Sequence, residues 1–249
     1  MPPTDHPTGN YRFVPLATDP RIVGGAPFSS GVRAQAGYEI VRATFQVPLP
    51  YRAGFAAAAR HLDAIGRPQT ALCAVEVRVP RPVTVEEFAA FNAGYRALLG
   101  EWGVYVDGQT PIARSNVAPL GVPPSETLLY AFAYTVPARE PAPSFFVSAA
   151  PEQADVRPGE TAPDALREKA ASALGAVRDV LAALELDWPA VTALGLYTHH
   201  DVHPFLEPEI LAAMGPAAVH GVHWYYGPPP IAGIEVEIDA RGTRRELRV

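Results

Sequence analysis

The feature that most constrains this chain is one order of predicted elements that occurs twice. Between residues 50 and 136, hydrophobic spacing predicts a helix, a strand, a second helix and two strands, at 51–66, 75–79, 83–102, 112–118 and 127–136. Between residues 144 and 249, after an opening strand at 144–149, the same order recurs at 161–186, 191–198, 204–214, 218–226 and 232–240. A repeated order of this kind indicates two structural units in one chain.

The proline-rich stretch at 137–143 suits an extended linker between the two units. The predicted organisation is therefore an N-terminal tail at 1–24, a first unit at 25–136, the linker at 137–143 and a second unit at 144–249. A single α/β domain is the alternative, because 249 residues also suit one large domain.

Charge and composition argue against two classes of partner. The formal net charge is −6, and the 20 Lys and Arg residues are scattered, so a nucleic-acid partner is not expected. No apolar run approaches the ~20 residues needed to cross a bilayer, and the N-terminal residues lack a signal-peptide pattern. We therefore expect no membrane partner and a cytoplasmic location. Cys73, the only cysteine, lies in an apolar run and is interpreted as a small buried hydrophobe.

Short motifs in both halves resemble the RidA (YjgF) family. In the first half, residues 88–95 are similar to the family's second-helix signature, and 113–117 resemble the run whose arginine binds the substrate carboxylate. Residues 27–29, Pro-Phe-Ser, resemble a Pro-Tyr-Ser stretch of the family. In the second half, 145–148 and 234–237 resemble its opening and closing strands.

The resemblance implies an α+β fold of two tandem RidA-like (chorismate-mutase-like) units, each a mixed β-sheet with two helices packed on one face. Units of this family assemble into rings with ligand clefts between them. We therefore expect a homo-oligomer, with a trimer as the first choice and a dimer as the second. Typical members hydrolyse enamines and imines to 2-oxo acids without a metal or an organic cofactor. No cofactor is therefore expected, and the expected ligand is a small carboxylated metabolite.

The residues that match the family's substrate-binding set lie in the first half. Arg114 falls at the family's arginine, whose guanidinium can bind a carboxylate through two parallel hydrogen bonds. Asn116 lies two residues further along the same strand and so on the same face, and Asn92 lies on the preceding helix. Phe28 belongs to the Pro-Phe-Ser stretch. These four residues are predicted to bind substrate.

The residues that match the catalytic set lie in the second half. Glu235 falls at the glutamate that positions the attacking water, and His220 falls where the arginine belongs. An imidazole and a carboxylate across a strand pair would form an acid–base couple, so both residues are predicted to be catalytic. A structural role for His220 is the alternative.

Three further histidines, with Asp201 among them, follow the strand at 191–198: His199, His200 and His203. If the strand continued through them, residues 199 and 200 would point to opposite faces, so no metal site is predicted.

Taken together, these observations favour a cofactor-free hydrolase or deaminase. It would act on a small enamine, imine or unsaturated amino or oxo acid at a cleft between domains. A non-catalytic protein that binds a small anion is one alternative. A lyase or isomerase that acts on a ring carboxylate, as chorismatases do, is the other.

Overall fold

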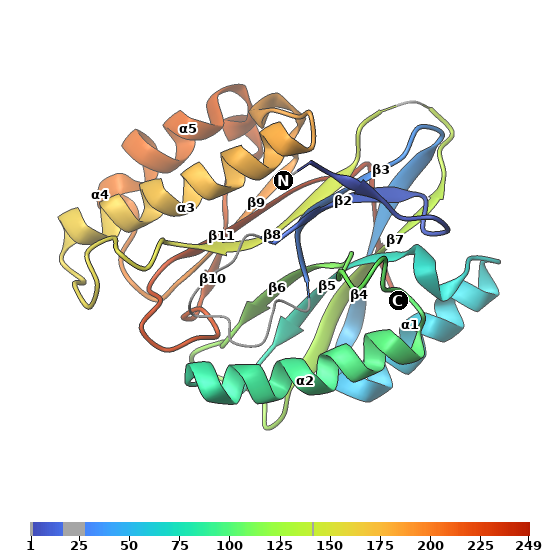
Figure 1. Cartoon of the computed structure of the whole chain (residues 1–249). Coiled ribbons are helices and arrows are strands. Elements are labelled where there is room, and N and C mark those ends of the chain that lie inside the picture. The colour runs from blue at the N-terminus through green and yellow to red at the C-terminus, as the bar shows by residue number, and fades with distance from the viewer. Residues whose placement is uncertain (1, 17–27, 141) are drawn as a thin grey trace.

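The computed structural model describes residues 2–16, 28–140 and 142–249 (Figure 1). Its strands are β1 (Thr4–Asp5), β2 (Tyr11–Pro15), β3 (Ser29–Ala34), β4 (Tyr38–Pro50), β5 (Leu72–Arg78), β6 (Ala113–Val117), β7 (Leu128–Pro137), β8 (Phe145–Pro151), β9 (Ala193–Thr198), β10 (His223–Tyr226), β11 (Glu237–Gly242) and β12 (Arg245–Arg248). Its α-helices are α1 (Tyr51–Ala64), α2 (Val85–Glu101), α3 (Pro163–Ala183), α4 (His203–Phe205) and α5 (Ala212–Met214). Short 3-10 helices are η1 (Gln69–Ala71), η2 (Trp188–Ala190) and η4 (Gly215–His220), and η3 (Leu206–Leu211) is a π-helix.

The two halves of the sequence share one mixed β-sheet. Within the described residues this sheet has 12 strands, and its main order is β10-β9-β11-β8-β3-β6-β5-β7-β4-β12. Strand β3 joins the halves, because it pairs antiparallel with β8 and, through Ser29 and Ala113, parallel with β6. The prediction of two tandem RidA-like units, each with its own sheet, is therefore wrong. Alternating side chains identified most of the strands but carried no information on which distant strand each one would pair with.

The C-terminal strands also connect the two halves. Strand β11 lies between β9 and β8, but β12, which follows it directly, pairs parallel with β4 at the other end of the sheet. The sheet must curl for this to happen, and the side chain of Glu246 on β12 contacts both Arg42 of β4 and Arg241 of β11. Because β12 was not predicted, neither was this closure. The predicted domain boundaries stay a prediction, and the tail at 1–24 lies partly outside the described residues.

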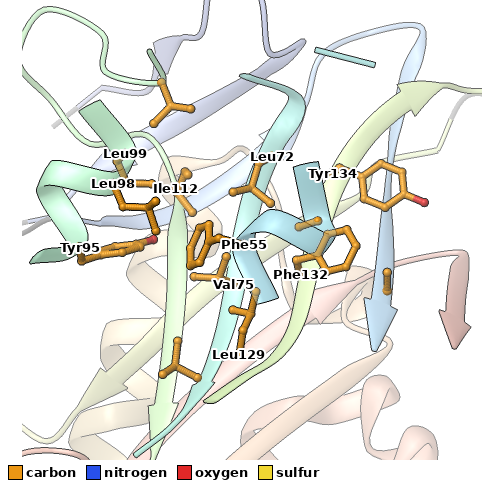
Figure 2. Close-up of a cluster of buried hydrophobic side chains, with 14 of the residues drawn as sticks. Phe55, Leu72, Val75, Tyr95, Leu98, Leu99, Ile112, Leu129, Phe132 and Tyr134 are labelled. Carbon is orange, nitrogen blue, oxygen red and sulfur yellow. The ribbon is translucent and has the colours of Figure 1, made fainter. Parts of the chain in front are cut away.

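Helices cover the outer face of the curled sheet in two separate places (Figure 1). Helices α1 and α2 pack on β4, β5 and β7, in a core that Figure 2 shows around Phe55, Tyr95 and Phe132. Helix α3 packs on β8, β9 and β11 in a second core. Helix α2 begins with a capping box, in which Thr84 accepts from the Glu87 backbone N–H. Within the described residues, no helix is both long enough and apolar enough to span a membrane.

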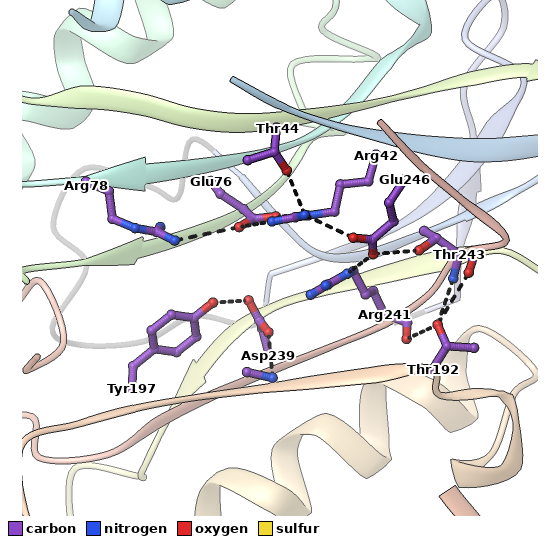
Figure 3. Close-up of polar contacts among 11 residues, drawn as sticks. Arg42, Thr44, Glu76, Arg78, Thr192, Tyr197, Asp239, Arg241, Thr243 and Glu246 are labelled. Carbon is purple, nitrogen blue, oxygen red and sulfur yellow. Dashed lines mark hydrogen bonds and ion pairs between the residues drawn. The ribbon is translucent and has the colours of Figure 1, made fainter. Parts of the chain in front are cut away.

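The inner face of the sheet is part apolar and part polar. Its apolar part includes Cys73, which is fully buried as predicted, and burial raises the pKa of its thiol. The polar part is the interior polar network, formed by side chains from β4, β5, β9, β11 and β12: Arg42, Thr44, Glu76, Arg78, Tyr197, Asp239, Arg241 and Glu246 (Figure 3). Within it, Arg42 and Arg78 contact Glu76, and Arg241 contacts Glu246, whereas Asp239 accepts from the Tyr197 hydroxyl.

Candidate functional site

The Arg114 side chain is buried between β6 and α2. Side chains alternate along β6, so Arg114 faces α2, whereas Ser115 faces the sheet interior and donates to Asp239 at 2.6 Å. The Arg114 side chain is almost fully buried, and its Nη2 donates to the Asn92 Oδ1 of α2 at 2.8 Å. Its guanidinium carbon lies 4.5 Å from the ring centroid of Phe28 and 4.7 Å from that of Tyr95.

Several polar atoms around this side chain have no partner in the described part of the chain. Among the described residues, no carboxylate forms an ion pair with Arg114, and its Nη1 makes no hydrogen bond. The hydroxyls of Tyr95 and Tyr51 and the Asn92 Nδ2 also make no hydrogen bond to the described residues. All three groups are buried and can donate. Buried donors without acceptors are unfavourable, and a carboxylate would satisfy several of them at once. These side chains together can therefore bind an anion. We refer to the set as the Arg114 pocket: Arg114, Asn92, Tyr95, Tyr51 and Phe28, whose ring lies against the guanidinium.

The electrostatics of the Arg114 pocket keep it positive. Burial lowers the pKa of Arg114, whereas Tyr95 and Tyr51 act to raise it. Arginine nevertheless stays protonated in proteins. Burial also raises the pKa of the Tyr95 and Tyr51 hydroxyls, so both stay neutral donors near pH 7. Glu237 is the carboxylate whose charge acts on Arg114.

A second polar cluster gathers where β9 ends. His199 and His200 follow Thr198, the last residue of β9, and their ring centroids lie 4.1 Å apart. The Nε2 of His200 lies 2.7 Å from the Glu235 Oε2. The two histidines would point to opposite faces only if the strand continued through them, but β9 ends at Thr198 and the chain bends after it. We name His199, His200 and Glu235 the His-His-Glu cluster.

A buried ion pair fixes the backbone of this cluster. The carboxylate of Glu152 accepts from the backbone N–H groups of Glu235 at 2.9 Å and Val236 at 3.0 Å. Lys169 of α3 in turn donates to Glu152 at 3.2 Å, and both side chains are almost fully buried. The buried pair of Glu152 and Lys169 thus holds the backbone of Glu235 in position.

One group of apolar side chains connects the two polar sites. Phe88 of α2 lies 5.5 Å from the guanidinium carbon of Arg114, and it packs with Ile231 and Ile234. Ile234 immediately precedes Glu235 in the chain. The apolar group beside Arg114 is therefore adjacent in sequence to the His-His-Glu cluster.

The structure brings together some of the residues predicted for the site and separates others. Arg114, Asn92 and Phe28 meet in one pocket, and Asn116 is buried two residues further along β6. His220 instead lies exposed on the 3-10 helix η4, where a strand was expected. Glu235 hydrogen-bonds His200 rather than His220.

The sequence reasoning also missed residues. Tyr51 and Tyr95 lie on the helices predicted at 51–66 and 83–102 and were not included in the predicted site, and their unpartnered hydroxyls are what mark them. Glu76 and Arg78 alternate with valines on β5, a pattern interpreted as the polar side of a half-buried strand. Both are buried, because that side faces the inside of the curled sheet.

Comparison with known proteins identifies the enzyme class and the family of this chain. The chain is 36% identical over 249 residues to the 2-amino-5-chloromuconate deaminase of Comamonas testosteroni, with 96% of this chain and 95% of that protein covered. Residues 3–247 match the family described as 2-aminomuconate deaminase CnbZ. The prediction of a deaminase is confirmed at the level of enzyme class. The chain belongs to the CnbZ family, and the predicted membership of the RidA family is wrong.

Two solved structures show a limited likeness in fold. A chorismatase is 13% identical with a TM-score of 0.48, over 92% of this chain and 80% of its own. A cyanuric acid hydrolase from A. caulinodans is 14% identical with a TM-score of 0.38, over 85% of this chain and 69% of its own.

Proposed function

We propose that this protein hydrolytically deaminates a 2-aminomuconate, a linear unsaturated dicarboxylate that carries an amino group next to one carboxylate. The observation that carries the proposal is the Arg114 pocket, in which a buried guanidinium nitrogen and neighbouring donors make no hydrogen bond to any of the described residues. The family description and the name of the Comamonas relative support the substrate class. A dicarboxylate also agrees with the expected small carboxylated metabolite.

The reaction adds water to carbon 2 and releases ammonia. The enamine form of the substrate takes a proton on carbon to become the imine, water adds to carbon 2, and the carbon–nitrogen bond breaks. The products are the 2-oxo acid, or its 2-hydroxy enol, and one ammonia molecule. No oxidant or reductant is required, so the step is balanced by water alone.

In this proposal the Arg114 pocket holds one substrate carboxylate, with Asn92 and Tyr95 as additional donors. Glu235 orients the water, as expected from the sequence, and His200 replaces His220 as the proton-transfer partner because it lies within hydrogen-bonding distance of Glu235. The ring of His199 packs beside the ring of His200. Its pKa is lowered by burial and by His200, so the ring is neutral near pH 7. Asn116 and Phe28 keep their predicted places in substrate binding.

The direct experiment supplies 2-aminomuconate, freshly generated by an oxidising enzyme, to the purified protein. We expect release of ammonium and of the 2-oxo or 2-hydroxy acid in a one-to-one ratio, each faster than in a reaction without protein. The comparison without protein is essential because enamines also hydrolyse spontaneously in water. Ammonium release at the spontaneous rate, with both 2-aminomuconate and its 5-chloro derivative, would contradict the proposal.

Several expectations from the sequence stay proposals alongside this one. They are a homo-oligomer of three or two chains, a cytoplasmic location and the lack of a nucleic-acid or membrane partner. Size-exclusion chromatography with light scattering measures the first of them.

A further inference from the structure

We propose that the His-His-Glu cluster binds one divalent transition-metal ion of the Zn²⁺ type. One potential ligand atom from each of His199, His200 and Glu235 lies within 4.8 Å of the other two. Imidazole nitrogens with one carboxylate oxygen form a donor set that suits Zn²⁺ and neighbouring divalent ions. With the ion bound, His200 and Glu235 would hold the ion and its water and would not exchange a proton with each other directly.

The distances between these atoms are close to what a bound ion needs. Zn–N and Zn–O bonds of 2.0–2.1 Å in a tetrahedral site place neighbouring ligand atoms about 3.3 Å apart. The His200 Nε2 and the Glu235 Oε2 are 2.7 Å apart, so an ion between them requires them to separate by only about 0.6 Å. Rotation of half-buried side chains can supply this, since the two side chains are 18% and 17% exposed.

One nitrogen of the cluster lacks a partner. The Nδ1 of His199 is buried and makes no hydrogen bond to any residue that the structure describes. A buried ring nitrogen without a partner is unfavourable. Coordination of an ion would use its lone pair, because a neutral imidazole is a good metal ligand.

The surrounding structure holds the ligands in place before any ion arrives. The His200 backbone N–H donates to the Thr198 Oγ1 at 3.2 Å, which fixes the bend after β9. The buried pair of Glu152 and Lys169 fixes the backbone at Glu235. Outer contacts of this kind orient ligands and strengthen metal binding.

Three protein ligands leave a coordination position for water. Catalytic zinc sites share this arrangement, and the ion lowers the pKa of its bound water to about 7. The idea that this water is the nucleophile rests on the proposed deaminase function. Binding of the ion is independent of that function and can be tested without substrate.

The test measures metal binding to the whole protein after chelator treatment and dialysis. Zn²⁺ is titrated by calorimetry, and Co²⁺ is titrated by visible absorption, which reports nitrogen and oxygen ligands directly. We expect one ion per chain. The substitutions His199→Gln, His200→Gln and Glu235→Gln should each weaken Zn²⁺ binding by roughly 100-fold or more, since loss of outer contacts alone costs 10- to 100-fold.

A matched control comes from the same segment. His203 is exposed, and among the described residues its ring hydrogen-bonds Asp201, so His203→Gln should leave the affinity unchanged. Circular dichroism and the melting temperature establish that each variant is folded. Failure of the folded wild-type protein to bind Zn²⁺ or Co²⁺ would overturn the proposal. So would equal losses in the control and in the cluster variants.

Discussion

The substitution Arg114→Met is expected to lower kcat/KM for 2-aminomuconate by roughly 10²- to 10³-fold, because removal of one partner of a buried charged hydrogen bond costs about 2–5 kcal/mol. The same substitution should leave the free energy of unfolding unchanged or raise it. Among the described residues, Arg114 forms no hydrogen bond or ion pair with a carboxylate, so its removal breaks no buried ion pair there. Methionine fills a similar volume with an apolar side chain.

This separation of activity from stability distinguishes a binding arginine from a structural one. Steady-state kinetics and urea unfolding on the same preparations measure both quantities. Arg42→Met is the matched control, because Arg42 is equally buried but is paired with Glu76. Its loss should lower stability by about 3–5 kcal/mol. Comparable destabilisation by both substitutions would mean that Arg114 holds the fold together, and the binding role would then lack support.

The substitution Glu76→Gln should produce a large loss of stability. The carboxylate of Glu76 accepts two hydrogen bonds from Arg42, at 2.6 and 2.9 Å, and both side chains are buried. Burial alone would raise the pKa of Glu76, but Arg42 and then Arg78 lower it to about 2. The difference of about 2.5 units from the ordinary value of 4.5 corresponds to about 3 kcal/mol at neutral pH.

The sign of the pH dependence follows from this lowered pKa. The stabilisation by Glu76 is fully present above pH 4.5, the ordinary value, and is lost as the pH falls toward about 2. Glutamine cannot titrate, so the difference between the wild-type protein and Glu76→Gln should shrink over this interval. Urea unfolding at several pH values from 7 to 3 measures it. A pH-independent difference would refute the ionised pair.

A surface pair supplies the control for this experiment. Arg178 and Asp179 form an exposed contact at 3.4 Å. Exposed ion pairs contribute little to stability, so Asp179→Asn should unfold as the wild-type protein does at pH 7.

The sequence predicted part of the local structure, because the signals of these elements are local. Spacing of apolar residues predicted α1, α2 and α3 close to their observed ends, whereas β1, β2, β4 and β12 were not predicted. Pairing of strands depends on segments that are far apart in the chain, and no periodicity records it. The links of β3 to β8 and of β12 to β4 were therefore missed, and with them the single curled sheet.

The same limit applies to the site. Arg114 and Asn92 were found because each lies in a short motif on a regular element. The contact between His200 and Glu235 depends on the bend that follows β9, which ends at Thr198 as predicted, and the spacing of apolar residues carries no information on that bend. Burial of Glu76 and Arg78 likewise required knowledge of what covers the inner face of the sheet.

The central claim is that the Arg114 pocket binds a carboxylate of the substrate, and titration with cis,cis-muconate tests it most directly. This dicarboxylate lacks the amino group and therefore cannot be deaminated. At about 100 times its dissociation constant it should stabilise the wild-type protein by about 2.7 kcal/mol, and it should leave the melting temperature of Arg114→Met unchanged. Equal stabilisation of both proteins would show that the carboxylate binds elsewhere.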